Sequence, residues 1–92
     1  MDFDVIDAEY LNDYRIRITF RDGSVGVADL GAYPNADNVF GAFLELDYFK
    51  AFRIEHGTLV WGDGELDLAP EKLYELATGN TVHYPLPRHQ AG

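Results

Sequence analysis

The sequence of 92 residues contains no cysteine, a single serine and a single tryptophan. The absence of cysteine excludes disulfides, thiolate nucleophiles and cysteine metal ligands. It also agrees with a protein that resides in a reducing compartment. No apolar run approaches the ~18 residues of a membrane-spanning helix. The first ten residues, MDFDVIDAEY, have neither the basic nor the apolar region of a signal peptide. We therefore expect a cytoplasmic protein that does not act at a membrane.

Basic residues are also scarce, with 7 Lys and Arg against 16 Asp and Glu and a net charge of −9. Such a surface repels phosphate backbones, which disfavours direct contact with nucleic acid and leaves solubility or a basic protein partner as its role. Hydrophobic residues make up 47% of the chain, which is ample for one small folded domain with its own core.

The first thirty residues predict a three-stranded meander. FDVIDAEY and YRIRITF both alternate, and a three-residue loop over 11–13, with Asn12 or Asp13 at positive φ, joins them. Asp22-Gly23 then indicates a two-residue type I′ turn. The expected partners are Tyr10 with Tyr14, Ala8 with Ile16, Ile6 with Ile18, Glu9 with Arg15, Asp7 with Arg17, Phe20 with Val25 and Ile18 with Val27.

Helical spacing follows over residues 38–52, where Phe40, Phe43 and Leu44 form one stripe. Asp37 or Asn38 is the expected N-cap, and Asp47 is expected to cap a second turn that carries Phe49.

The second half predicts a further hairpin and a helix. A turn at His56-Gly57 pairs Ile54 with Leu59 and Phe52 with Trp61, and residues 65–68 extend after a turn at 62–64. Residues 70–78 form a helix that begins at Pro70 and ends at Gly79, although Ala69 lacks an N-capping oxygen. We expect Leu73, Leu76 and Ala77 to face inward.

Together these patterns predict an α+β fold, in which antiparallel hairpins and a meander pack on two or three short helices. The single domain should cover residues 1–79. Residues 80–92 contain two prolines and no hydrophobic period, and we expect them to form a flexible tail.

Four carboxylates stand close together in the stretch VWGDGELDLAPEKLY, namely Asp63, Glu65, Asp67 and Glu71. A calcium loop that starts at Asp63 would need glycine at Leu68 and glutamate at Tyr74, so the pattern fails at both demanding positions. A turn followed by a helix start explains these carboxylates better, and we expect no metal and no cofactor. The alternative is a small-ligand or metal site at a rim formed by Trp61, Asp63 and Asp67.

No residues with a catalytic pattern are visible, so we expect no enzymatic activity. Ser24 has no strained elbow around it, His56 fits a turn, and His83 and His89 have no metal-ligand spacing. Three arginines on one strand face (Arg15, Arg17, Arg21) could contact an anion or nucleic acid, but a cross-strand ladder with acidic residues is the preferred interpretation.

The sequence resembles a small bacterial family of unknown function, DUF2442, over about residues 3–76. The matching motifs are FRDG at 20–23, Asp29-Leu30, Phe49, WGDG at 61–64, Asp67-Leu68, Pro70-Glu71 and Leu73-Tyr74. The chain departs from the family pattern at Gly62, where proline is usual, and at Ala69, where a capping serine is frequent.

This resemblance implies an α+β fold without known catalytic residues. Members are often encoded beside another small protein in what looks like a toxin–antitoxin pair, and some carry a helix-turn-helix domain after this one. Residues 80–92 are too few for such a domain. We therefore expect a small acidic interaction module, similar to the antitoxin-like member of a pair, with a small basic protein as partner. A homo-oligomer of this chain is left as an alternative assembly.

Overall fold

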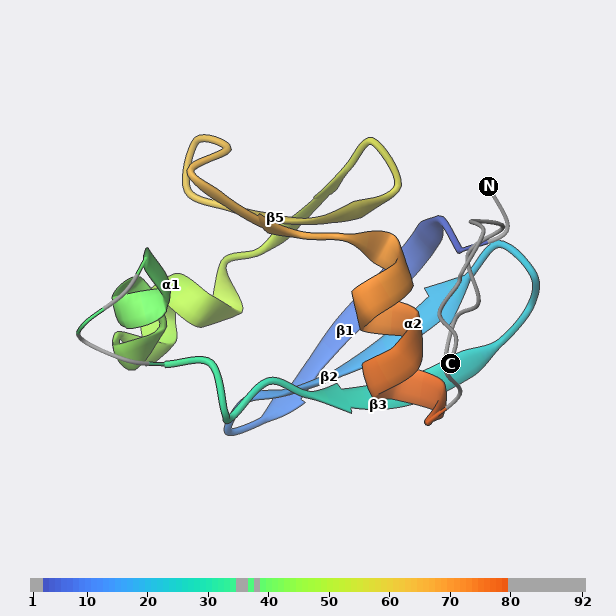
Figure 1. Ribbon diagram of the computed structural model, residues 1–92, viewed down its shortest axis with the longest axis horizontal. Helices are drawn as coiled ribbons and strands as arrows, with labels where there is room; N and C mark the ends of the chain where they lie inside the picture. Colours follow the sequence, from blue (N-terminus) through green and yellow to red (C-terminus); the bar gives the residue numbers. More distant parts are fainter. Residues whose placement is uncertain (1–2, 35–36, 38, 80–92) are drawn as a thin grey trace, which may run out of the picture.

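The computed structural model describes residues 3–34, 37 and 39–79, which form two antiparallel sheets of three strands with short helices between and after them (Figure 1). The α+β prediction is confirmed. The predicted tail at 80–92 lies outside the described residues. In chain order the elements are β1 (Val5–Asn12), β2 (Arg15–Phe20), β3 (Val25–Asp29), the 3₁₀ helix η1 (Val39–Leu44), α1 (Leu46–Lys50), β4 (Arg53–Glu55), β5 (Thr58–Trp61), β6 (Leu66–Leu68) and α2 (Pro70–Thr78).

The strands β1, β2 and β3 form the predicted meander, but the first hairpin is displaced by two residues from the predicted register. Its turn is Asp13-Tyr14, with Asp13 at φ 48°, and the ladder shifts at Ile6 and Leu11. A displacement of two keeps each side chain on its face, because the pleat has period two. Among the β1 residues that were predicted to face inward, only Ile6 faces outward, and it is 54% exposed. The observed pairs are Ala8 with Ile18, Glu9 with Arg17, Tyr10 with Ile16 and Asn12 with Arg15.

The second hairpin is displaced by one residue, so the predicted partners of Val25 and Val27 are wrong. The loop has three residues, since the Phe20 amide donates to the Ser24 carbonyl at 2.9 Å and Gly23 has φ +92°. This is a type I turn with a glycine bulge instead of the predicted two-residue turn. Gly26 and Ala28 therefore lie opposite Ile18 and Ile16, and both valines face outward.

The predicted helix over 38–52 is divided into η1 and α1. A 3₁₀ helix turns 120° per residue, so Phe40 and Phe43 share a side and Leu44 is rotated away from them. Leu44 is accordingly 55% exposed, which corrects its predicted place in the inward stripe. The N-cap of α1 is Glu45, without a side-chain hydrogen bond, and Asp47 lies inside the first turn; Phe49 is buried as predicted.

The second sheet, with order β4-β5-β6, has the predicted register at His56-Gly57. His56 has φ 54° and Gly57 has φ 78°, as a type I′ turn requires. Ile54 pairs with Leu59, and the ring centroids of Phe52 and Trp61 lie 6.4 Å apart. Leu59 and Trp61 are fully buried, whereas Ile54 is 40% exposed.

The helix α2 follows β6 and returns to the meander, where it packs mainly on β3 (Figure 1). Its contact with β3 depends on Gly26, because a Cβ at that position would lie 2.0 Å from the carbonyl oxygen of Ala77. Leu73 is fully buried, and Leu76 and Ala77 pack beside the core, as predicted.

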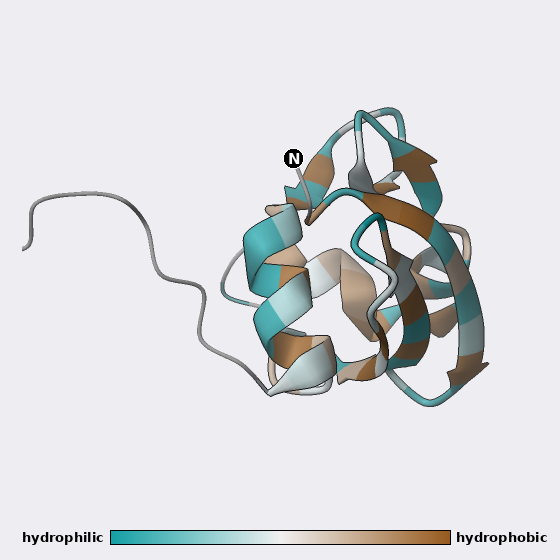
Figure 2. Ribbon diagram, turned by 90° about the vertical axis from the view of Figure 1, so that its right-hand side faces the viewer, coloured by the Kyte–Doolittle hydropathy of each residue, from teal (hydrophilic) through white to brown (hydrophobic). Residues whose placement is uncertain are grey.

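The core lies between the two sheets, and the strands alternate hydrophobic and hydrophilic residues along their length (Figure 2). An aromatic group joins the sheets to η1 and α1: Phe43 lies 5.1 Å from Phe49 and 4.7 Å from Trp61 between ring centroids. The hydroxyl of Tyr14, at the tip of the first hairpin, donates to the Phe43 carbonyl at 2.7 Å. The largest fully buried side chains are Trp61, Phe20, Phe43, Phe49, Ile16, Ile18, Leu30, Leu59 and Leu73.

The substitution Ala69→Ser should stabilise the protein by about 1 kcal/mol. Ala69 already has the extended conformation of an N-cap, at φ −61° and ψ 140°, but no side chain satisfies the first amides of α2. A serine oxygen would accept one of those N–H groups. Urea unfolding followed by circular dichroism measures the gain, and Ala69→Val, which adds bulk without an oxygen, is the control. Equal stability of the Ser and Val variants would contradict the prediction.

Candidate interaction surface

Trp61, the first residue of the predicted rim, is fully buried. Its indole N–H donates to the Phe49 carbonyl at 2.8 Å, and its ring packs between Phe43 and Phe52. The polar atom of the indole is therefore already used inside the core. Trp61 acts here as a core residue, and its ring is not presented to solvent.

Asp63 and Asp67 are exposed, but they do not converge with Trp61. Asp67 pairs with Val60, whereas Trp61 pairs with Leu66, and neighbouring positions on a strand point to opposite faces. Asp63 lies in the turn before β6, and Glu71 lies in the first turn of α2. Across residues 3–34, 37 and 39–79, no three His, Asp or Glu side chains are grouped so that they could hold a metal ion.

The turn between β5 and β6 instead meets α1 at one end of the molecule (Figure 1). The Tyr48 hydroxyl donates to a Glu65 carboxylate oxygen at 3.3 Å, and both lie close to Gly62. Burial raises the pKa of Tyr48, and the negative charges of Glu65 and Asp63 raise it further. The hydroxyl therefore stays protonated and remains a hydrogen-bond donor in a negative environment.

Exposed leucines accompany these acids. Leu44 is 55% exposed and Leu46 is 39% exposed, and exposed acidic residues, Glu45 and Asp47, alternate with them along the chain. We define the acidic end as Leu44, Glu45, Leu46, Asp47, Tyr48, Asp63 and Glu65. None of its four carboxylates has an ion pair with Lys or Arg in the described part of the chain. Lys50, the basic residue of α1, lies 5.5 Å from the centroid of the Tyr10 ring.

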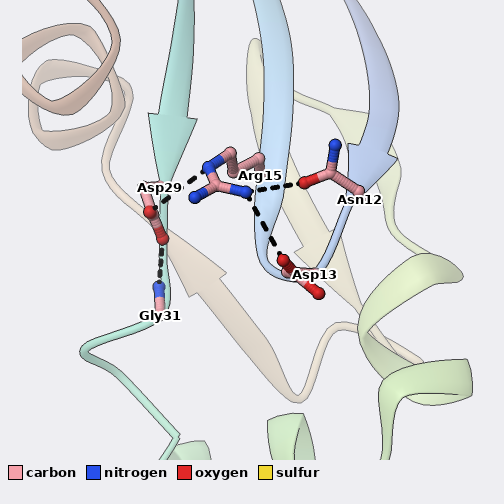
Figure 3. Close-up of polar contacts among 5 residues, drawn as sticks. All are labelled: Asn12, Asp13, Arg15, Asp29 and Gly31. Atoms are coloured by element: carbon pink, nitrogen blue, oxygen red, sulfur yellow. Dashed lines mark hydrogen bonds and ion pairs between the residues drawn. The ribbon is translucent and has the colours of Figure 1, made fainter.

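Each arginine of the predicted stripe is paired with a carboxylate. Arg15 lies 3.6 Å from Asp29 and donates to Asn12 at 2.7 Å, while Asp29 also accepts the Gly31 amide (Figure 3). The ladder interpretation is therefore supported, with partners that differ from the predicted ones. Arg17 pairs with Glu9 at 2.6 Å and Arg21 with Asp4 at 3.6 Å.

Ser24 belongs to a polar cluster that joins α2 to the second hairpin. The Tyr74 hydroxyl donates to Asp22 at 3.0 Å and lies 3.3 Å from the Ser24 hydroxyl, while the Ser24 amide donates to Asp22 at 2.8 Å. The Tyr74 ring packs edge-on against Phe20 at 5.0 Å. The cluster holds the helix against the sheet, and sequence spacing did not indicate it because Tyr74 lies 52 positions after Asp22.

The Asp22 cluster should make stability dependent on acid pH. The Ser24 amide lowers the pKa of Asp22 below its ordinary 3.8, desolvation opposes that shift, and the hydroxyls of Ser24 and Tyr74 assist it. A lowered folded-state pKa gives stability that is present above 3.8 and is lost as the pH falls through the folded value. Urea midpoints of wild type and Asp22→Asn should therefore differ most at neutral pH and converge in acid. A constant difference at all pH values would contradict this linkage.

Of the histidines, His56 occupies the predicted turn and is exposed. His83 and His89 lie outside the described residues. None of the described helices is both long enough and apolar enough to cross a membrane.

Comparison with known families gives one match. Residues 5–79 match the family described as "Protein of unknown function (DUF2442)". Because this match covers most of the 92 residues, the chain belongs to the DUF2442 family, as its motifs indicated. No curated protein and no solved structure matches the sequence.

Proposed function

We propose that this DUF2442 protein is a non-enzymatic interaction module of the bacterial cytoplasm that binds a small basic protein through its acidic end. One observation carries the proposal: two exposed leucines, Leu44 and Leu46, lie among four carboxylates without cationic partners in the described part of the chain. Exposed apolar side chains beside uncompensated charge are typical of sites that dock a partner of opposite charge.

In this proposal each part of the acidic end has a separate role. The leucines supply apolar area that a partner can bury, and Tyr48 supplies an aromatic anchor whose hydroxyl is oriented by Glu65. The carboxylates would steer a basic partner and raise the association rate, an effect that falls as salt increases. This arrangement supports the antitoxin-like role that the family resemblance implies.

A small-ligand or metal site at Trp61, Asp63 and Asp67 is the alternative proposal. The burial of Trp61 and the opposite directions of Trp61 and Asp67 give it less support. A screen of Trp61 fluorescence against ligands and divalent ions tests it, and a saturable change would favour this role over protein binding.

The first experiment is capture of partners by the tagged protein from its native lysate, with mass spectrometry of the eluate. We expect one small basic protein in stoichiometric amount. The purified pair is then compared with the variant Leu44→Ser/Leu46→Ser, which should bind at least ten-fold more weakly, or about 1.4 kcal/mol.

The matched control is Ile6→Ser/Ile54→Ser, which removes isoleucines of 54% and 40% exposure outside the acidic end. It should leave the affinity unchanged. Equal losses in both variants, or an affinity that does not fall with rising salt, would reject the acidic end as the binding surface.

A further inference from the structure

The dipeptide Asp-Gly occurs at two turns of the protein, at 22–23 and at 63–64. Both pairs are exposed, and their glycines have φ +92° and +88° with nothing within 4 Å of an added Cβ. A glycine places no side chain beside the carboxyl group of the preceding aspartate, so its backbone nitrogen can approach the carboxyl carbon. The hydrogen bonds around the two pairs are what distinguishes them.

The pair at 22–23 is held by three hydrogen bonds. The Gly23 amide donates to the Phe20 carbonyl at 2.9 Å. The Asp22 carboxylate accepts the Ser24 amide at 2.8 Å and the Tyr74 hydroxyl at 3.0 Å. The Ser24 amide also lowers the pKa of Asp22, which keeps this carboxyl group ionised. The amide nitrogen and the carboxyl group of this pair are therefore both engaged with other partners.

The pair at 63–64 lacks such partners. Among the described residues, neither the Asp63 carboxylate nor the Gly64 amide makes a hydrogen bond or an ion pair. Residues 62–65 form the turn between Trp61 and Leu66, which are paired across β5 and β6. Gly62 and Gly64 both have positive φ, and a turn with two glycines has few side chains that restrict its backbone. The nitrogen of Gly64 is therefore free to approach the Asp63 carboxyl carbon.

We propose that Asp63-Gly64 is a modification site, at which aspartate isomerises spontaneously to isoaspartate. The Gly64 nitrogen attacks Cγ of the protonated Asp63 carboxyl group. A C–N bond forms, the carboxyl hydroxyl leaves with the amide proton as water, and the product is a five-membered succinimide ring. Water then adds to the former backbone carbonyl of Asp63 and breaks its bond to the Gly64 nitrogen, which leaves the chain connected through Cγ. Addition of water at Cγ instead restores aspartate.

Isoaspartate changes the turn without changing its charge. The Cβ of residue 63 becomes part of the main chain, so the connection between Trp61 and Leu66 gains one backbone atom, and the former α-carboxyl group becomes the side chain. Glu65, which accepts the Tyr48 hydroxyl at 3.3 Å, lies in the same turn. The acidic end therefore changes shape and keeps all its carboxylates. The new side chain is the group that protein-isoaspartate methyltransferases methylate, which makes the aged protein a substrate for that class of enzyme.

The purified wild-type protein tests this proposal, because each molecule carries both pairs. After long incubation at neutral pH, a protein-isoaspartate methyltransferase and S-adenosylmethionine label the isoaspartate, and peptide mapping locates the label. We expect at least about ten-fold more label at 63 than at 22, because cyclisation at 22 must first break three hydrogen bonds. Incubation in urea removes these bonds, so the two positions should then react at similar rates. Equal labelling in the folded protein, or the same ratio with and without urea, would overturn the proposal.

Two variants separate the role of the hydrogen bonds from that of the dipeptide. Tyr74→Phe keeps the ring and removes one hydrogen bond from the Asp22 carboxylate, so labelling at 22 should rise several-fold while labelling at 63 is unchanged. Asp63→Glu keeps the charge, but glutamate would need a six-membered ring, which forms far more slowly, so labelling at 63 should disappear. No rise in Tyr74→Phe, or a total label in Asp63→Glu equal to that of the wild type, would reject the assignment. These readouts need no partner protein, so they are independent of the proposed function.

Discussion

Replacement of Trp61 by alanine is expected to destabilise the protein by about 3–5 kcal/mol. The indole is fully buried and contacts the rings of Phe43, Phe49 and Phe52, which come from η1, α1 and the start of the second sheet. Alanine would leave a cavity where these three segments meet. It would also leave the Phe49 carbonyl without its indole partner. For a domain of this size, the loss is a large part of the total free energy of unfolding.

Urea unfolding by circular dichroism gives the size of this effect. The control is Trp61→Phe, which keeps an aromatic ring and removes the hydrogen bond, and it should lose less than Trp61→Ala. A melting temperature of Trp61→Ala equal to that of the wild type would show that the indole is not the centre of the core.

The substitution Gly26→Ala is expected to destabilise the protein by about 3 kcal/mol, at the upper end of the range for overpacked cores. The added Cβ would lie 2.0 Å from the carbonyl oxygen of Ala77 and 3.2 Å from the Cβ of Ala77, so the whole helix α2 must move. A backbone contact cannot be relieved by a side-chain rotation. Without this contact, alanine would stabilise a strand relative to glycine. A loss of stability in Gly26→Ala therefore indicates the close approach of α2 to β3.

Thermal unfolding of Gly26→Ala measures this cost, with Lys72→Ala as the control. Lys72 is exposed on the same helix, and its replacement should change stability by less than about 0.5 kcal/mol. A stabilised Gly26→Ala variant would mean that α2 does not press on β3.

Turn chemistry explains which parts of the fold the sequence predicts correctly. His56-Gly57 takes two positive φ angles, so the register of β4 and β5 follows directly from the turn. Arg21-Asp22-Gly23 contains an equally strong Asp-Gly signal, yet the loop includes one more residue. The Asp22 side chain accepts the Ser24 amide and favours the longer loop. This single added residue turned Val25 and Val27 to the opposite face.

The acidic end could be predicted only in part. Exposed acids near residue 63 and a tyrosine near a loop are visible in the sequence, but the contact of Tyr48 with Glu65 depends on how α1 packs below the β5–β6 turn. Leu44 is exposed because η1 is a 3₁₀ helix, with three residues per turn instead of the 3.6 of an α-helix. Hydrophobic spacing alone does not distinguish a 3₁₀ helix from an α-helix, so the sequence pattern predicts this leucine in the core.

The return of α2 to the meander also sets the order in which the chain can fold during synthesis. β3 ends at Asp29, and the helix that covers its inner face ends at Thr78, so 49 residues must be added before the cover is complete. At roughly 5–20 residues per second, a ribosome needs roughly 2–10 s for them. During that interval Ile16 and Ile18, both fully buried in the finished protein, lie on an uncovered sheet face. A nascent chain paused in this window is the form that chaperones would bind.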